Sequence, residues 1–183
     1  MKKYLALLLA LVMSLSLFAC GKKEGDDNKD KDKTKYKVAM ITDYGDITDQ
    51  SFNQTTYEAC KAFAEKNNIE FKYYKPAGDN TADRVAMIES AVEEGFNVIV
   101  MPGYAFGGAI VEAAPQHKDV KFIALDVAKG DLLEAGVAKA GEKYDYNPDN
   151  WELEKYVDMS NVYCAIYQEE LCGYMAGYAA VKL

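Results

Sequence analysis

Residues 43–54 contain the side chains best suited to binding a small molecule. The segment holds three aspartates, three amide side chains, a serine and one phenylalanine, Phe52. A flat aromatic ring can stack on a heterocycle, and ionised carboxylates accept strong hydrogen bonds. A mostly apolar run at 36–40 precedes the segment, and a helical pattern follows it. The chemistry therefore falls where a strand ends and a helix begins, which is where open α/β sheets bind ligands.

Two further strand patterns end in residues of the same kind. The apolar run 97–101 is followed by the glycine-rich loop 102–108, and the strand pattern 120–126 ends at Asp126. The carboxyl ends of parallel strands meet at one edge of a sheet. We therefore expect Asp43, Asp126 and the loop 102–108 to line a single ligand crevice.

Strand and helix patterns alternate along the chain from residue 36. Such alternation predicts an α/β fold with a doubly wound parallel sheet and helices on both faces. The polar segment 127–160 breaks the alternation, and we interpret it as an insertion outside the core. The predicted strands are 36–43, 70–75, 97–101, 120–126 and 161–167, and the predicted helices are 51–67, 81–94, 105–114 and 169–182.

The N-terminal residues have the pattern of a secretory signal peptide. Two lysines precede an apolar stretch and small residues, so we predict a signal peptide at 1–19. The sequence before Cys20 resembles a bacterial lipobox, which predicts that Cys20 is lipidated and anchors the protein to the outer face of the cell membrane. The charged run 20–35 predicts a disordered tether. A soluble secreted protein with an incidental Cys20 is the alternative.

The composition argues against several classes of function. The formal net charge of −8 disfavours binding to nucleic acid. Apart from Cys20, the cysteines are Cys60, Cys164 and Cys172, without a CxxC pair, and the chain has one histidine. We therefore predict no metal site and no cofactor. Cys60 and Cys164 fit small buried hydrophobic positions, while a disulfide between Cys164 and Cys172 remains an open alternative.

Four groups of residues together resemble the basic membrane protein family of lipoproteins over residues 36–183. The family resemblance implies a type I periplasmic-binding-protein fold, of which 36–168 is the N-terminal lobe and 169–183 the helix crossing into a second lobe. Because the pattern stops at that helix without a cap, we expect the natural chain to continue. The groups are Asp43-x-Gly45-x-x-x-Asp49-x-Ser51-Phe52-Asn53-Gln54, then Gly103-x-x-Phe106, then 122–126, then Glu169-Glu170-x-x-Gly173-Tyr174-x-Ala176-Gly177-Tyr178-x-Ala180.

The resemblance also implies a function and roles for single residues. Members are similar to purine nucleoside receptors of ABC transporters, which deliver ligand to a membrane permease driven by a separate ATPase, and we expect a monomer. In the family pattern Phe52 stacks on the purine, Asn53 bonds its edge and Asp126 accepts ribose hydroxyls. The ligand-binding residues that the resemblance implies are Asp43, Asp49, Ser51, Phe52, Asn53, Gly103, Phe106 and Asp126.

Several of these residues have a purely structural alternative. Asp49 or Ser51 could cap the first helix, Phe52 could belong to the core, and Asp126 could cap the segment that follows it. Two other functions also stay open, which are a receptor for a sugar or signal molecule and a nucleoside-processing enzyme using Asp43 or Asp126. No nucleophile is paired with a base in the sequence, so we predict no catalytic residues.

Overall fold

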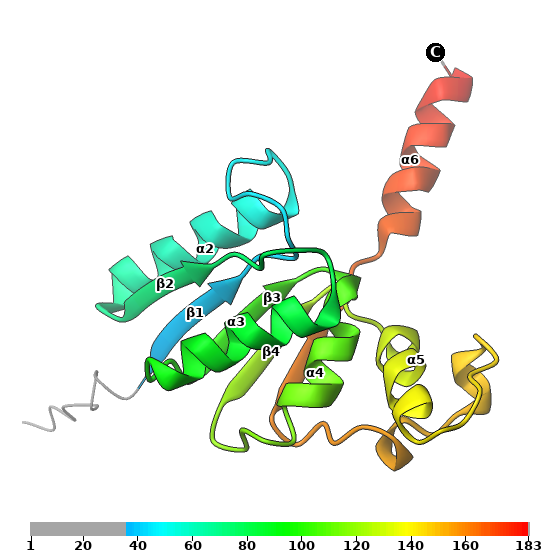
Figure 1. Ribbon diagram of the computed structural model, residues 1–183. Coiled ribbons are helices and arrows are strands. Elements are labelled where there is room, and N and C mark those ends of the chain that lie inside the picture. The colour runs from blue at the N-terminus through cyan, green and yellow to red at the C-terminus, as the bar shows by residue number, and fades with distance from the viewer. Residues whose placement is uncertain (1–35, 183) are drawn as a thin grey trace, which may run out of the picture. The chain divides into compact units, whose positions relative to one another are not determined.

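The computed structural model describes residues 36–182. The predicted signal peptide, the predicted lipidation site Cys20 and the predicted tether all lie outside the described residues, and so does Leu183. The described residues form an α/β lobe around one sheet (Figure 1).

The sheet has five strands, and every pair of neighbours is parallel. The strand order is β2-β1-β3-β4-β5, so the chain crosses over after β2 and then proceeds outward in sequence order. This order is that of a doubly wound fold, and the predicted fold class is confirmed. The strands are β1 (Lys37–Ile41), β2 (Glu70–Tyr74), β3 (Val98–Pro102), β4 (Lys121–Leu125) and β5 (Val162–Ala165).

Helices cover the two faces of the sheet unequally. Figure 1 shows α2 behind the sheet, whereas α3 and α4 lie in front of it. The helices are α2 (Phe52–Asn67), α3 (Thr81–Glu93), α4 (Gly107–Ala113), α5 (Lys129–Lys139) and α6 (Glu169–Lys182), with short 3-10 turns η1 (Tyr104–Phe106), η2 (Pro148–Asn150) and η3 (Leu153–Lys155). Each predicted helix therefore has a counterpart, and the expected helix 105–114 is divided into η1 and α4.

The main core lies between the sheet and the helices α3, α4 and α5. Alternate residues of β1, β3 and β4 point into it, as the pleat requires. Strand β3 is buried from Ile99 to Pro102, which explains why its sequence is a continuous apolar run. The largest fully buried side chains include Ile88, Ile99, Met101, Phe106, Ile110, Phe122 and Leu132.

The segment 127–160 was predicted as an insertion outside the core, and this prediction is wrong where Val127, Leu132 and Val157 join the main core. Residues 129–139 form α5, and Leu132, Leu133 and Val137 on this helix are buried. The helical period is weak in the sequence because glycine and alanine occupy many of the remaining positions of α5. The rest of the segment packs its aromatic side chains, Tyr144, Trp151 and Tyr156, against α5.

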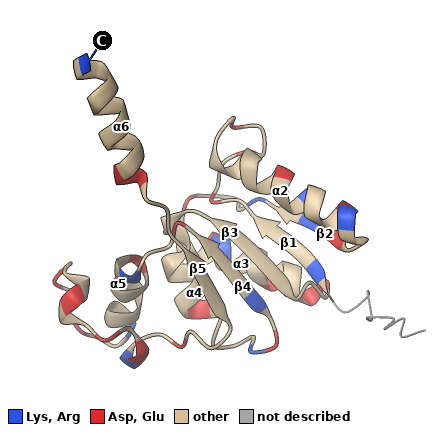
Figure 2. Cartoon of the chain, turned by 180° about the vertical axis from the view of Figure 1, so that it is seen from behind, with Lys and Arg blue, Asp and Glu red and all other residues tan. Residues whose placement is uncertain are grey.

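The C-terminal helix α6 has no buried residue. Figure 2 shows that its charged residues lie only at its two ends. Cys172 on α6 is exposed, whereas Cys60 and Cys164 are partly buried, and all three thiols are free. The alternative of a disulfide between Cys164 and Cys172 is therefore not supported. Within residues 36–182, no helix has the length and apolar character that a bilayer span requires.

Candidate functional site

The predicted ligand residues are carried by loops at the carboxyl edge of the sheet. Strands β1, β3 and β4 are neighbours, so the loops that follow them start side by side. The loop after β3 passes close to the loop after β1, because a Cβ built on Gly103 would lie 4.0 Å from the Cβ of Asp43. Gly103 has a φ of 115°, which only glycine adopts readily.

Asp43 stands at the end of β1 and uses only one of its carboxylate oxygens within the loop. Oδ1 accepts hydrogen bonds from the backbone N–H of Tyr44 (2.6 Å) and Gly45 (2.7 Å) and from Nδ2 of Asn53 (2.9 Å). Partial burial raises the pKa of Asp43, but these bonds and the positive charge of Arg84 outweigh it, so the pKa is lowered overall. Among the described residues, none donates a hydrogen bond to Oδ2.

Asp49 uses both of its oxygens to cap α2. Oδ1 accepts from the backbone N–H groups of Ser51 (2.8 Å) and Gln54 (3.1 Å), and Oδ2 accepts from the N–H (3.3 Å) and Nδ2 (3.0 Å) of Asn53. Side-chain acceptors at a helix start stabilise the unpaired amides there. Ser51 makes no cap hydrogen bond with its side chain. The capping alternative therefore describes Asp49 and not Ser51.

Asn53 connects the two aspartates from a buried position. It is 5% exposed, its Nδ2 donates to both Asp43 and Asp49, and its Oδ1 accepts from the N–H of Asp43 (3.2 Å). Gly45 lies directly over this amide, since a Cβ at Gly45 would be 2.7 Å from Nδ2. Both N–H hydrogens of Asn53 are thus engaged inside the loop.

An aromatic pair lies beside this loop. The Phe52 and Tyr167 rings have centroids 5.9 Å apart in an edge-to-face arrangement. Phe52 is partly exposed and Tyr167 is 48% exposed, so Phe52 is not a fully buried core residue. Tyr44 and Tyr104, in the loops after β1 and β3, are also exposed. Tyr167 was not among the predicted ligand residues, and only its place as the last residue of the predicted strand 161–167 could have drawn attention to it.

Asp126 follows β4 and has a free carboxylate. Its N–H donates to the carbonyl of Ala165 (2.6 Å) and its φ is 61°, but its side chain makes no hydrogen bond or ion pair within residues 36–182. The helix that follows is capped by Asp131, whose Oδ2 accepts from the N–H of Ala128 (2.7 Å). The alternative that Asp126 is the cap is therefore not supported. Burial and the charges of Asp126 and Glu134 raise the pKa of Asp131 despite that bond.

Phe106 lies beneath the edge. Its side chain is fully buried in the main core, and the guanidinium carbon of Arg84 is 5.7 Å from the ring centroid. The neighbouring Tyr104 is 69% exposed. Of these two aromatic residues, Tyr104 is exposed to solvent on the loop, whereas Phe106 anchors the loop in the core.

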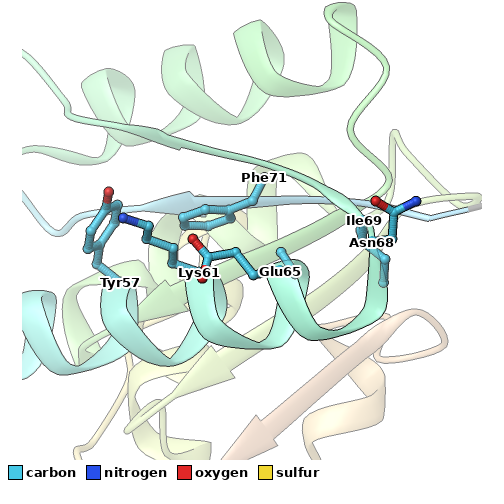
Figure 3. Close-up of a pocket in the computed structure, with 7 residues that line it drawn as sticks. Tyr57, Lys61, Glu65, Asn68, Ile69 and Phe71 are labelled. Carbon is cyan, nitrogen blue, oxygen red and sulfur yellow. The ribbon is translucent and has the colours of Figure 1, made fainter.

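The hollow shown in Figure 3 lies away from the predicted residues. It has a volume of about 360 Å³ and is formed by α2 and β2, with Tyr57, Lys61, Glu65 and Phe71 among its lining residues. None of the predicted ligand residues lines it. Within residues 36–182, no cluster of three or more His, Cys, Asp or Glu side chains could hold a metal ion.

Comparisons with known proteins agree with the fold. A family model described as "ABC transporter substrate-binding protein PnrA-like" matches residues 36–183. The CD4+ T-cell-stimulating antigen of Listeria innocua is 34% identical over 132 residues, which are 67% of this chain and 36% of the relative. The ABC transporter nucleoside-binding protein BmpA of Lactococcus lactis is 24% identical over 178 residues, which are 95% of this chain and 42% of that protein.

Among solved structures, a fragment of a putative lipoprotein from Peptoclostridium difficile has a TM-score of 0.48 and 20% identity, covering 81% of this chain and 98% of that one. The chain spans well under half the length of the curated relatives it matches. The resemblance seen in the sequence is confirmed by the family match, which covers every described residue. The chain belongs to the family of PnrA-like ABC transporter substrate-binding proteins.

Proposed function

We propose that this chain supplies the N-terminal lobe of a lipid-anchored receptor that captures a nucleoside for an ABC transporter, with a purine as the preferred base. The observation that carries the proposal is the free carboxylate of Asp126 at the same sheet edge as the partly exposed ring of Phe52. A family of substrate-binding proteins needs groups that are available to ligand. The Asp126 carboxylate has no hydrogen bond or ion pair within residues 36–182, and the Phe52 ring stays partly exposed beside Tyr167.

The base would be recognised by stacking. Phe52 and Tyr167 form an edge-to-face pair, and a planar heterocycle beside Phe52 gains stacking worth about 1–3 kcal/mol, as found for bases on aromatic side chains. Tyr44 and Tyr104 are exposed on neighbouring loops and offer further aromatic surface. Stacking tolerates different bases, so preference for a purine would rest on its larger ring area.

The ribose would be recognised by carboxylates. Asp126 can accept hydrogen bonds from two vicinal hydroxyl groups, and hydrogen bonds to an ionised acceptor are about twice as strong as neutral ones. Asp43 has one oxygen, Oδ2, left for the ligand, while Oδ1 is held by the loop. These two aspartates follow strands β1 and β4, which flank β3.

In this proposal the remaining predicted residues fix the conformation of the loops at the sheet edge. Asp49 and Asn53 fix the loop after β1, and Ser51 starts α2. Gly103 lets the loop after β3 approach Asp43, and Phe106 supports it from the core. Order that exists before binding lowers the entropic cost of binding.

The proposal places the receptor on the outer face of the cell membrane through lipid on Cys20, as a monomer. Its partners would be a membrane permease and a separate ATPase. Relatives named as uncharacterised lipoproteins in Pyrococcus furiosus and Pyrococcus abyssi support the lipid anchor. Replacing Cys20 by serine should release the protein from the membrane fraction, and continued attachment would refute lipidation.

The nucleoside assignment is tested by isothermal titration of guanosine, adenosine, uridine and ribose into the complete gene product, prepared without its signal peptide and from Lys35 onward. We expect purine nucleosides to bind more tightly than uridine and ribose to bind weakly. Chromatography of the ligand afterwards should return it unchanged, because the proposal includes no chemical step. Absence of binding by every nucleoside would overturn the proposal, and tight binding of ribose alone would favour a sugar receptor.

A further inference from the structure

A buried arginine, Arg84, lies behind the candidate site. It comes from the first turn of α3, and its side chain is only 4% exposed. Arg84 was not among the residues predicted to bind ligand. A guanidinium carries a permanent charge, and burying a charge is costly unless it is paired and hydrogen-bonded. The contacts of Arg84 therefore show what the protein gains from keeping it there.

These contacts join three loops at the carboxyl edge of the sheet. Nε donates to the backbone carbonyl of Asp43 (3.0 Å), in the loop after β1. Nη2 donates to Oδ1 of Asp79, in the loop after β2. The guanidinium also lies over the ring of Phe106, with 5.7 Å between its central carbon and the ring centroid, and Phe106 belongs to the turn after β3.

The pairing with Asp79 does not by itself account for this position. Asp79 precedes Arg84 by five residues, and its own side chain is 58% exposed. An ion pair between two residues this close in sequence could form on the surface, where it would avoid the cost of burying the guanidinium. The contact with Phe106 requires burial, because that ring is fully buried, and from the same position the guanidinium also reaches the backbone carbonyl of Asp43.

We infer that Arg84 is a positioning residue of the ligand site, whose guanidinium holds the Asp43 loop and the Phe106 turn in the arrangement that binds ligand. This inference rests on the proposed nucleoside function. Arg84 does not contact Asp126 or Phe52, the two side chains whose free surface is proposed to meet the ligand. It acts on the ligand through the backbone of Asp43, whose side chain in turn orders Tyr44, Gly45 and Asn53.

Three variants of the complete gene product separate this role from general support of the fold. Arg84→Lys keeps the charge but loses the planar fork that reaches two oxygens at once. Arg84→Met keeps the length of the side chain and removes its charge. Asp79→Asn is the matched control, because it weakens the ion pair and leaves the contacts of Arg84 with Asp43 and Phe106 in place.

The first readout does not depend on ligand. Amide hydrogen exchange, followed residue by residue, should accelerate more in segment 43–54 of both Arg84 variants than in β3 and β4, where exchange reports global unfolding. Asp79→Asn should leave segment 43–54 protected. Uniform acceleration across the sheet in the Arg84 variants would show a general role in stability and overturn the inference, as would unchanged exchange in segment 43–54.

The second readout is the nucleoside affinity of the same proteins. Both Arg84 variants should bind at least about tenfold more weakly than wild type, the effect of losing one buried charged hydrogen bond. Asp79→Asn should change the affinity less than about threefold. Faster exchange in segment 43–54 without loss of affinity would overturn the inference while leaving the nucleoside function intact. If wild type binds no nucleoside, the proposed function fails, and with it the role of Arg84 in nucleoside binding, whatever the exchange result.

Discussion

Asp49 and Asp126 are both acidic residues at the carboxyl edge of one sheet, and the protein uses them in opposite ways. The carboxylate of Asp49 accepts four hydrogen bonds from three neighbouring residues. The carboxylate of Asp126 accepts none within residues 36–182, although its backbone is fixed to Ala165. The carboxylate of Asp49 is held by its own loop, whereas the carboxylate of Asp126 is left without a hydrogen-bond partner within residues 36–182. Asp43 combines both uses, with one oxygen engaged and the other available.

This contrast predicts that stability and binding will separate by residue. Changes in the β1 loop should first reduce the stability of the fold, whereas changes at Asp126 should reduce affinity alone.

The largest effect is expected from Asn53→Ala. The change removes a buried amide and leaves Asp43 and Asp49 without a shared donor, so the free energy of unfolding should fall by about 2–3 kcal/mol. Urea denaturation measures it. Gln54→Ala is the control, because the Gln54 side chain is partly exposed and its hydrogen bonds within residues 36–182 are with Gln50 and Glu58. Equal losses of unfolding free energy in the two variants would contradict the proposed role of Asn53 in holding the loop.

A tenfold or larger loss of nucleoside affinity, about 1.4 kcal/mol, is expected from Asp126→Asn. Asparagine keeps the shape of the side chain and tolerates the positive φ of this position, so the free energy of unfolding should change by less than about 0.5 kcal/mol. Titration calorimetry and urea denaturation of the same samples give both numbers. Unchanged affinity would mean that the free carboxylate of Asp126 does not contact the ligand.

A smaller effect is expected from Asp49→Ala, which removes the cap of α2. Loss of a helix cap costs about 1 kcal/mol of unfolding free energy. Ser51→Ala should cost much less, because the Ser51 hydroxyl makes no cap hydrogen bond. Thermal unfolding of the two variants, side by side, measures the difference, and a larger loss in Ser51→Ala would contradict the assignment of the cap.

The smallest expected effect is a change in the free energy of unfolding at acidic pH. Hydrogen bonds and, for Asp43, the charge of Arg84 lower the pKa values of Asp43 and Asp49 in the folded protein against the opposing effect of burial. Their stabilisation is therefore complete above the unfolded pKa of about 3.9 and is lost as pH falls through the lower folded values. The difference in unfolding free energy between wild type and Asn53→Ala should shrink from about pH 5 downward. A difference that grows on acidification would reverse the sign argued for both aspartates.

The sequence allowed the sheet and most helices to be predicted, for reasons that specific residues make clear. The run 97–101 could only be a strand buried on both faces, and α2 and α3 have helical periods. Helix α5 was missed because two glycines, Gly130 and Gly136, and two alanines, Ala135 and Ala138, dilute its apolar period. Small residues can reflect close packing of helices as readily as a loop.

The candidate site was predicted in its location and not in its internal bonding. Strand ends placed Asp43, Gly103 and Asp126 at one edge, which the strand order bears out. Which carboxylates are engaged depends on the path of the loop, including the left-handed conformation of Gln50, and no residue pattern specifies that path. Arg84 was overlooked because a single arginine in the first turn of an amphipathic helix usually faces water.

The three free thiols differ in reactivity. Burial raises the pKa of Cys60 to about 11 and also raises the pKa of Cys164, so little of either is in the reactive thiolate form at neutral pH. Cys172 is exposed on α6. Among the described residues, a maleimide dye should therefore attach to Cys172 alone. Within residues 36–182, a fluorescent or spin label therefore has a ready position on α6, the one α-helix there without a buried residue, and no substitution is needed to create it.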